Sequence, residues 1–360
     1  MSPATERTPA ADGYAMPAEW ERHEATWLSF PHNAADWPGK FAPVPWAYAE
    51  IVRWACEGEW VRLIVKDAAH EKVARRVLER SHVSLERIQF LRWPTDRGWM
   101  RDTGPIWLTR AGEKAIARFR FDGWSKYPNW KKDVKLPERA AKKLGAPLLP
   151  IVHGGREVVL EGGAIDVNGA GTILTTEECM LDPSVQVRNP GFGREDYEAV
   201  FRDALGARNT IWLGHGIAGD DTHGHVDDLA RFVGPRTIVL VREDDPQDPN
   251  YAPLEENRER LQSSRLEDGG KPEVVYLPMP EPVHFDGQRL PASYANFYVT
   301  NAAVLVPTFD DPADHEALGI LSALFKDRQV VGIHARDLVW GLGTIHCLSQ
   351  QEPGVPLGAG

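Results

Sequence analysis

The sequence predicts an α/β fold made of repeated units, and two observations carry this prediction. Segments with a strand pattern and segments with a helical pattern follow one another in the order strand, helix, strand, strand along the 360 residues. Polar residues suited to chemistry recur near the start of the last strand of each unit, at Asp102, Glu161, His225 with Asp227, Asn296 and Cys347. No unit could bury both faces of its own small sheet, whereas five units packed around an axis could. We therefore expect a single domain with one central site.

The units follow an entry segment that predicts a short strand at 25–30 and a helix at 45–57. The first unit has a strand at 61–67, a helix at 68–80, and strands at 87–93 and 99–109. The second has segments 115–121, 138–145 and 157–169, and the third has 172–178, 193–206, 209–213 and 225–233. The fourth has 237–244, 252–262, 272–278 and 293–300, and the fifth has 303–311, 313–325, 328–334 and 344–349.

Composition limits the possible partners. A formal net charge of −11 argues against nucleic acid and anionic membranes and suits a cationic ligand, although solubility alone would also explain it. With 42% apolar residues and no run of about 18 of them, the chain predicts a globular core and no membrane span. The three cysteines, at 56, 179 and 347, are too scattered for a disulfide framework, which favours a reducing cytoplasm.

The chain ends are expected to lie outside the catalytic domain. Residues 1–16 contain Glu6 and Arg7 where a signal peptide would need apolar residues, so we interpret them as a flexible tail. Residues 17–353 then form the domain, and 354–360 form a second flexible tail.

The stretch 219–232, GDDTHGHVDDLARF, holds the densest group of titratable side chains. If 225–233 is a strand, its period of two places His225 and Asp227 on the same face. Asp and His at such density could also bind zinc or iron, but the spacing matches none of the HExxH or CxxC patterns. We therefore expect His225 to be an acid and base, and no metal.

Cys347 is the candidate nucleophile. It lies in GLGTIHCLSQQ, where Gly341 and Gly343 allow a ligand and the backbone to approach closely. If this run is extended, His346 points to the opposite face from Cys347. The alternative is that Cys347 is an ordinary buried cysteine with no catalytic role. Cys56 and Cys179 lack such a setting, so we expect them to be structural.

The carboxylates of Asp102, Glu161 and Asp227 would surround this thiol. Such a site repels anions and suits a planar guanidinium, whose paired donors match carboxylate oxygens. Trp99 and Trp124 could form a wall for that cation, although core packing would also explain each of them. Asp102 and Glu161 could equally be turn or capping residues.

In combination, the motifs WMRDTGP, LEGGAIDVNGAGTILTTEECML, DDTHGHVDDLARF, ASYANFYVTN and GLGTIHCLSQQEP resemble the agmatine deiminase family, including its bacterial peptidylarginine-deiminase-like branch. The resemblance runs from 17 to 353. It implies the pentein fold of guanidino-group-modifying enzymes, a five-bladed α/β propeller with pseudo-five-fold ββαβ-type repeats around a central active site. It also implies a cytoplasmic homo-oligomer, a dimer or tetramer, that needs no cofactor.

The resemblance assigns roles to the site residues by motif. Cys347 matches the nucleophile, His225 the general acid and base, Asp102 and Asp227 the carboxylates that hold the guanidinium, and Glu161 the residue that orients the histidine. The implied reaction is hydrolysis of agmatine to N-carbamoylputrescine and ammonia through a covalent amidino-cysteine, a step of putrescine and polyamine biosynthesis.

This sequence departs from the agmatine-specific pattern where the far end of the substrate would bind. Asp221 and His223 replace the Glu and Asp of a DETDG loop, GLGTIH replaces GGGNIH, and Asp122 follows Phe121 where Asn is common. We expect Asp221 and Asp122 to read the amine, with Asp220 and His223 nearby influencing substrate choice. Another guanidino substrate such as arginine or peptidyl-arginine, amidinotransfer, a metallohydrolase and a non-catalytic guanidino binder are the alternatives.

Overall fold

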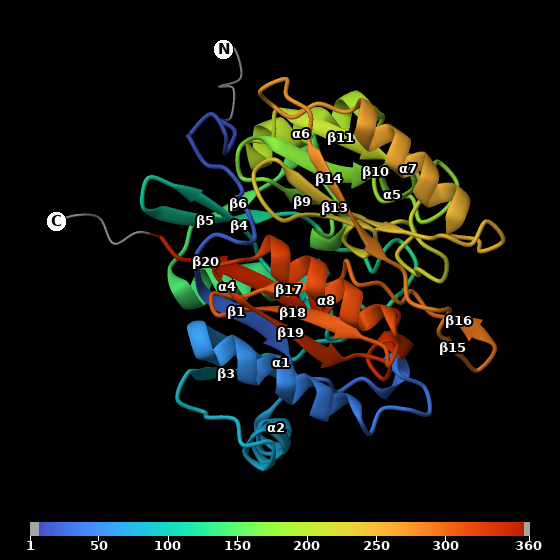
Figure 1. The fold of residues 1–360 in the computed structure, drawn as a ribbon. Coiled ribbons are helices and arrows are strands. Elements are labelled where there is room, and N and C mark those ends of the chain that lie inside the picture. Colours follow the sequence, from blue (N-terminus) through green and yellow to red (C-terminus); the bar gives the residue numbers. More distant parts are fainter. Residues whose placement is uncertain (1–6, 356–360) are drawn as a thin grey trace.

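Five sheets of three or four strands carry most of the β-structure in this computed structural model, which describes residues 7–355 (Figure 1). The first sheet contains β20 (Ser349–Pro353), β1 (His23–Ser29), β2 (Trp60–Val65) and β3 (Ile88–Arg92). The second contains β4 (Ile106–Arg110), β5 (Glu113–Arg118) and β6 (Leu148–Pro150), and the third contains β9 (Asp166–Val167), β10 (Thr172–Thr176) and β11 (Asn209–Leu213). The fourth contains β12 (Ala230–Phe232), β13 (Thr237–Arg242) and β14 (Glu273–Pro278). The fifth contains β17 (Tyr298–Val299), β18 (Ala303–Thr308) and β19 (Gln329–His334).

One helix crosses over between the two parallel strands that each sheet contains. Parallel neighbours need such a crossover, whereas antiparallel neighbours can be joined by a turn. The crossover helices are α1 (Val44–Gly58), α4 (Leu136–Leu144), α6 (Arg194–Leu205), α7 (Tyr251–Ser263) and α8 (Ala313–Leu324). A further helix, α2 (Ala68–Arg80), leads to the extra strand β3 of the first sheet. Each sheet is therefore built on an antiparallel strand, a central strand, a helix and a parallel strand.

Short elements lie within and between these units. They are η1 (Ala34–Asp36), α3 (Met100–Thr103), η2 (Asp133–Lys135), η3 (Gly162–Ala164), α5 (Glu177–Leu181), η4 (Val226–Asp228), η5 (Val339–Gly341) and α9 (Ile345–Leu348). Two small hairpins, β7 (Val152–His153) with β8 (Arg156–Glu157) and β15 (His284–Phe285) with β16 (Gln288–Arg289), complete the described structure.

The predicted unit boundaries were wrong, although the type and order of most elements are confirmed. The last strand assigned to the first unit, β4, pairs with β5 of the next sheet and not with β3. The two residues between them, Ala111 and Gly112, have φ of 40° and 86°, as the tight turns of two-residue hairpins require. The first sheet instead uses the entry strand β1 and the entry helix α1.

The two ends of the chain meet in the first sheet. Strand β20 runs antiparallel to β1, with Thr26 opposite Gln351, and the red and blue ribbons lie side by side in Figure 1. The C-terminal strand therefore completes the sheet that the N-terminal strand begins.

Apolar spacing on the helices explains how they pack against the sheets. Tyr48, Ile51, Val52 and Ala55 of α1 are fully buried and follow the i, i+3, i+4, i+7 spacing of one helix face. The central strand β18 is buried on both faces for five of its six residues. These residues belong to a large apolar cluster that also includes residues of the first, third and fourth sheets.

The predicted N-terminal tail is partly wrong. Tyr14 and Met16 are buried, Met16 N donates a hydrogen bond to Leu205 O, and Ala10 N donates to Asp203 O. At the other end, Gly354 N donates to Arg22 O. The tail predictions for 1–6 and 356–360 lie outside the described residues.

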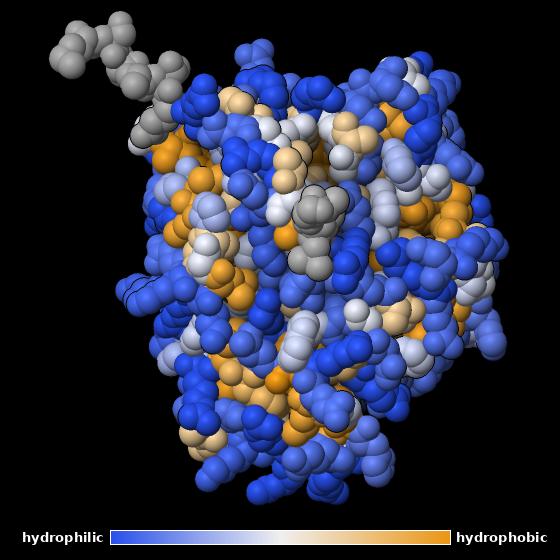
Figure 2. Space-filling model, turned by 90° about the vertical axis from the view of Figure 1, so that its left-hand side faces the viewer, coloured by the Kyte–Doolittle hydropathy of each residue, from blue (hydrophilic) through white to orange (hydrophobic). Residues whose placement is uncertain are grey.

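The surface mixes hydrophobic and hydrophilic side chains. Figure 2 shows hydrophobic residues in several separate areas of one face, with hydrophilic residues between them. Across residues 7–355, none of the helices has both the length and the apolar character needed to cross a bilayer.

Candidate active site

A cavity of about 210 Å³ brings together segments from distant parts of the chain. Its lining includes five of the predicted site residues, namely Trp99, Asp102, Trp124, Asp221 and Cys347. Three further ones, Glu161, His225 and Asp227, are buried next to this group, as the contacts below show. These residues come from four of the five predicted units, and Asn296 of the fourth unit contacts Cys347, so the predicted residues meet in the structure.

Cys347 lies in the single turn of helix α9, so the extended run predicted at 344–349 was wrong. The turn directs Cys347 and His346 toward one carboxylate instead of to opposite faces. Oδ2 of Asp227 lies 3.7 Å from Cys347 Sγ and 2.5 Å from His346 Nδ1. A Cβ on Gly343 would lie 3.1 Å from this sulfur and 2.9 Å from the Trp99 ring, so the predicted need for glycine has a steric cause.

Asn296 holds the nucleophile turn in place. Its Oδ1 accepts a hydrogen bond from Thr344 Oγ1 at 2.7 Å, and its Nδ2 lies 3.0 Å from Cys347 Sγ and 2.9 Å from Asp228 Oδ1. Burial and the neighbouring carboxylates raise the pKa of the Cys347 thiol well above its ordinary value, and the amide of Asn296 opposes this only in part. The resting group is therefore a thiol.

His225 precedes the short helix η4, and the strand predicted from 225 begins only at Ala230. Asp220 Oδ2 accepts from Gly224 N at 2.7 Å and from His225 N at 3.2 Å, which curls the loop where extended pairing was expected. The shared face of His225 and Asp227 therefore arises from a turn and not from a strand.

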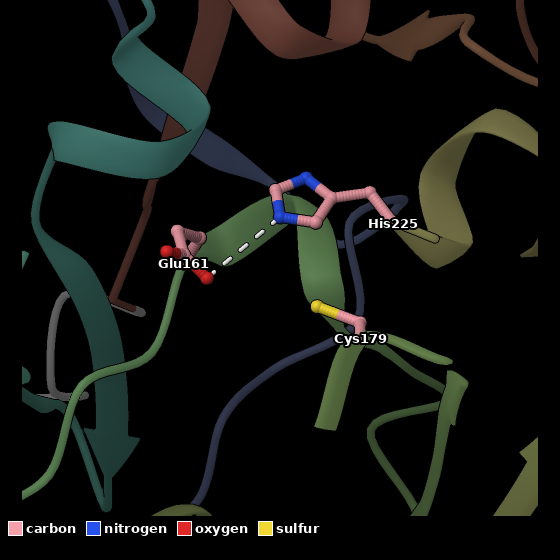
Figure 3. A group of neighbouring side chains, drawn as sticks. All are labelled: Glu161, Cys179 and His225. Carbon is pink, nitrogen blue, oxygen red and sulfur yellow. Dashed lines mark ion pairs between the residues drawn. The ribbon is translucent and has the colours of Figure 1, made fainter. Parts of the chain in front are cut away.

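The imidazole of His225 lies between the carboxylates of Asp102 and Glu161, and Figure 3 shows the side of the ring that faces Glu161. Nδ1 is 3.7 Å from Asp102 Oδ1, and Nε2 is 3.7 Å from Glu161 Oε2, both longer than a hydrogen bond. Burial lowers the pKa of His225, but Asp102, Cys179 and Glu161 outweigh it and raise the pKa well above its ordinary value. The ring is therefore an imidazolium that can supply a proton.

The two carboxylates that flank His225 differ in pKa. Burial raises the pKa of Asp102 to about 6, and this side chain accepts from Trp124 Nε1 at 2.9 Å and Gly163 N at 3.1 Å. Burial alone would raise the pKa of Glu161 too, but the Arg188 guanidinium, 3.3 Å away, and His225 lower it to about 2. Glu161 is therefore the permanent anion of the pair.

Sequence reasoning missed a buried chain of ion pairs behind Asp227. His346 Nε2 lies 2.8 Å from Glu19 Oε2, which also pairs with Arg101 at 3.1 Å and Arg231 at 2.9 Å. Burial raises the pKa of Asp227, but hydrogen bonding to His346 lowers it below its ordinary value. The position of His346 beside Cys347 is a signal that could have identified it; for Glu19 and Arg188 the sequence offers none.

Only one of the residues expected to select the substrate reaches the cavity. Asp221 lines it, accepts from Tyr127 Oη at 2.7 Å and pairs with Lys126. Asp122 is not among the lining residues, because its carboxylate accepts from Ser125 N and Oγ and closes a turn. His223 pairs with Asp182 at 3.0 Å, and Asp220 holds its own loop.

Asp36 and Arg97, paired at 2.8 Å, line the cavity and were not predicted.

Two buried groups within the described residues could hold a metal ion. One consists of Asp227, Asp228 and Cys347, and the other of Glu161, Cys179 and His225. Cys179 thus lies beside the catalytic candidates and not in a purely structural setting, whereas Cys56 is half-buried elsewhere.

Comparison with known proteins identifies the family. Residues 15–353 match the Porphyromonas-type peptidyl-arginine deiminase family. The chain is 34% identical to an agmatine deiminase of Ectopseudomonas mendocina, over 98% of each chain. Its structure resembles agmatine deiminase of Enterococcus faecalis with a TM-score of 0.89, at 28% identity and over 98% of this chain and 99% of the other. A cysteine-to-serine form of C. jejuni agmatine deiminase with substrate bound gives a TM-score of 0.84, at 28% identity over 95% and 97%. As its motifs indicated, the chain belongs to the family of agmatine deiminases and Porphyromonas-type peptidyl-arginine deiminases.

Proposed function

We propose that this protein hydrolyses the guanidine group of agmatine, giving N-carbamoylputrescine and ammonia through a covalent amidino-cysteine intermediate. It would be a hydrolase acting on a C–N bond of linear amidines. The observation that carries this proposal is the position of one thiol, Cys347, in a cavity with Asp102 and 3.7 Å from Asp227. The agmatine deiminases among its relatives support the choice of substrate.

Substrate charge would activate the nucleophile. Asp102 and Asp227 would each pair with donors of the guanidinium, since planar paired donors fit carboxylate oxygens. The same carboxylates help to raise the pKa of the Cys347 thiol. A bound cation offsets their charge, so it lowers that pKa and favours the thiolate only when substrate is present.

The chemistry then proceeds in two halves. The Cys347 thiol releases its proton to solvent when the cation binds, and its sulfur forms a bond to the guanidinium carbon. His225 donates its proton to one amino group, and the C–N bond breaks to release ammonia. His225, now neutral, accepts a proton from water, whose oxygen attacks the same carbon. The C–S bond breaks, the thiol recovers a proton, and the ureido product leaves. Glu161, 3.7 Å from His225 Nε2, would orient the ring and stabilise its charge.

The far end of agmatine would lie toward Asp221. This carboxylate lines the cavity and is partly exposed, so it can attract the substrate amine, while Trp99 and Trp124 would form the walls around the methylene chain. We propose no such role for Asp122. Arginine or peptidyl-arginine is the second candidate substrate, because Arg97 also lines the cavity and could bind a carboxylate or a carbonyl oxygen.

Ammonia release from agmatine, arginine, N-terminally blocked arginine and short arginine peptides tests the proposal. Agmatine should give the highest kcat/KM. Cys347→Ala should show no turnover above background, and His225→Ala should lose about 10²- to 10⁴-fold, the usual contribution of a general acid and base. Absence of ammonia with agmatine at millimolar concentration would refute the proposal, and transfer of the amidino group to an added amine would indicate an amidinotransferase.

We further propose that residues 17–353, together with the packed segment 7–16, form one catalytic domain, a five-bladed pentein propeller around the cavity. Five sheets of one pattern, and the pairing of β20 with β1, support this arrangement. We also propose a cytoplasmic homo-oligomer, a dimer or tetramer, whose catalysis uses side chains alone. Three free cysteines support a reducing compartment. Light scattering of the purified protein measures the oligomeric state, and a monomer would refute that part.

A further inference from the structure

We propose that Glu161, Cys179 and His225 form an inhibitory zinc site beside the substrate cavity (Figure 3). One ligand atom from each of the three side chains lies within 4.8 Å of the other two, and all three residues are buried. Thiolate, imidazole and carboxylate are the ligand types that zinc prefers. Occupancy would use the ring nitrogen of His225 and so remove the proton donor of the reaction.

The distance between Glu161 and His225 fits two zinc ligands better than a hydrogen bond. Glu161 Oε2 and His225 Nε2 are 3.7 Å apart, and within the described residues neither atom has a hydrogen-bond partner. Two ligand atoms at about 2.05 Å from a tetrahedral zinc lie about 3.4 Å apart. Buried polar atoms are normally paired, and a zinc ion bound to both atoms in place of the His225 proton would satisfy both.

Neighbouring residues already orient two of the ligands. Asp102 Oδ1 lies 3.7 Å from Nδ1 of His225, and its charge would favour keeping the ring proton on that nitrogen, which leaves the Nε2 lone pair for the metal. Arg188 engages Oε1 of Glu161 and leaves Oε2 free. This carboxylate–histidine arrangement is common behind zinc ligands.

The backbone fixes the position of Cys179. It lies in the first turn of α5, where its N–H donates to the side chain of the capping residue Thr176 at 3.1 Å. A ligand on a capped turn needs little rearrangement to bind. The site therefore combines three side chains that are held by the fold before any metal arrives.

The second candidate group, Asp227 with Asp228 and Cys347, is less suited to a metal. Cys347 Sγ and Asp228 Oδ1 both contact the amide of Asn296, and Asp227 Oδ2 is engaged by His346. Zinc there would have to break these hydrogen bonds. In the Glu161, Cys179 and His225 group, zinc would take the place of the His225 proton and leave these hydrogen bonds of Asn296 and His346 intact.

Zinc binding to a Cys347→Ala variant tests the proposal, because this substitution removes the nucleophile as a competing ligand. Isothermal titration with zinc chloride should give one zinc per chain. Adding Cys179→Ala or Cys179→Ser should weaken binding at least about 100-fold, and adding Glu161→Gln should also weaken it. Adding Cys56→Ala, the matched control, should leave the zinc affinity unchanged. Thermal unfolding checks that each variant is folded.

Cobalt provides a second readout that identifies the ligand. Cobalt bound to the Cys347→Ala protein should show a thiolate charge-transfer band, and this band should disappear when Cys179 is also replaced. Loss of zinc binding through Cys347→Ala alone, or unchanged binding after replacement of Cys179 in a folded protein, would overturn the proposal. Both measurements use metal without substrate, so they stand even if agmatine proves to be the wrong substrate.

In the unmodified enzyme, zinc should inhibit turnover of whichever guanidino substrate the protein hydrolyses, and a chelator should restore the rate. Inhibition that persists after chelation would contradict a reversible site.

Discussion

The Nδ1 atom of His346 lies 2.5 Å from the carboxylate oxygen of Asp227 that also faces the nucleophile, Cys347. The other ring nitrogen of His346 lies 2.8 Å from Glu19. His346 thus lies between two carboxylates. Its contact with Asp227 lowers the pKa of that carboxyl below its ordinary value in a site rich in carboxylates.

Replacing His346 with Gln should lower kcat/KM about 10- to 100-fold, the usual effect of losing a residue that orients a functional group. Gln can donate one hydrogen bond to Asp227 but carries no charge, so the pKa of Asp227 should rise. The loss should therefore be largest at acidic pH and smaller at alkaline pH. Steady-state kinetics at several pH values measure this, and an equal loss at every pH would show that the residue acts only through packing.

Asp102→Asn should stabilise the protein while abolishing activity. The folded pKa of Asp102, about 6, exceeds the ordinary value of 3.8, so the folded state is penalised as pH rises through this window. The difference corresponds to roughly 3 kcal/mol above pH 6 and vanishes below about pH 4. Thermal unfolding of both proteins between pH 4 and 8 should show a Tm gap that opens with pH. A Tm difference between the two proteins that is the same at every pH would refute an electrostatic cause of the stabilisation.

Alkylation of Cys347 should accelerate with pH beyond the range of an ordinary thiol. Burial and three carboxylates raise its pKa well above 9, and the thiolate is the reactive form. The rate of inactivation by iodoacetamide should still be rising above pH 9 in the substrate-free enzyme. Peptide mapping locates the modified residue, and a plateau near pH 7 would mean that the thiolate is already present without substrate.

Asp221→Ala and Asp122→Ala form a matched pair that tests where the substrate amine binds. Asp221 lines the cavity, so its loss should raise the KM for agmatine by about tenfold, as expected for one partly exposed ion pair. Asp122 closes a turn on Ser125, so its loss should lower Tm with little effect on KM. The reverse result would restore Asp122 as the residue that reads the amine.

Helices and strands long enough to show a repeating apolar pattern could be predicted from the sequence. Elements of a single turn could not. The strand at 209–213 was predicted with the bounds that the structure gives, and helix α6 to within one residue at each end. The turns that carry His225 and Cys347 span only three or four residues, too few for a helical period to show. Their expected strand geometry was therefore wrong, although the residues themselves meet as predicted.

Contacts between distant segments were the other limit. Glu19 contacts His346 across most of the chain, and no local pattern marks it as part of a site. Arg188 likewise lies outside the motifs and contacts Glu161. Asp122 shows the opposite error. Its departure from the family pattern predicted a contact with the substrate, but its carboxylate closes a turn.

The pairing of β20 with β1 makes the active site depend on contacts between distant segments. Cys347 lies two residues before the strand that docks against residues 23–28, so the nucleophile is held in place only when segments far apart in the sequence have met. A chain in which this pairing has not formed would carry the carboxylates and the acid–base histidine without a positioned nucleophile. Closing the first sheet is therefore the folding step that completes the catalytic group.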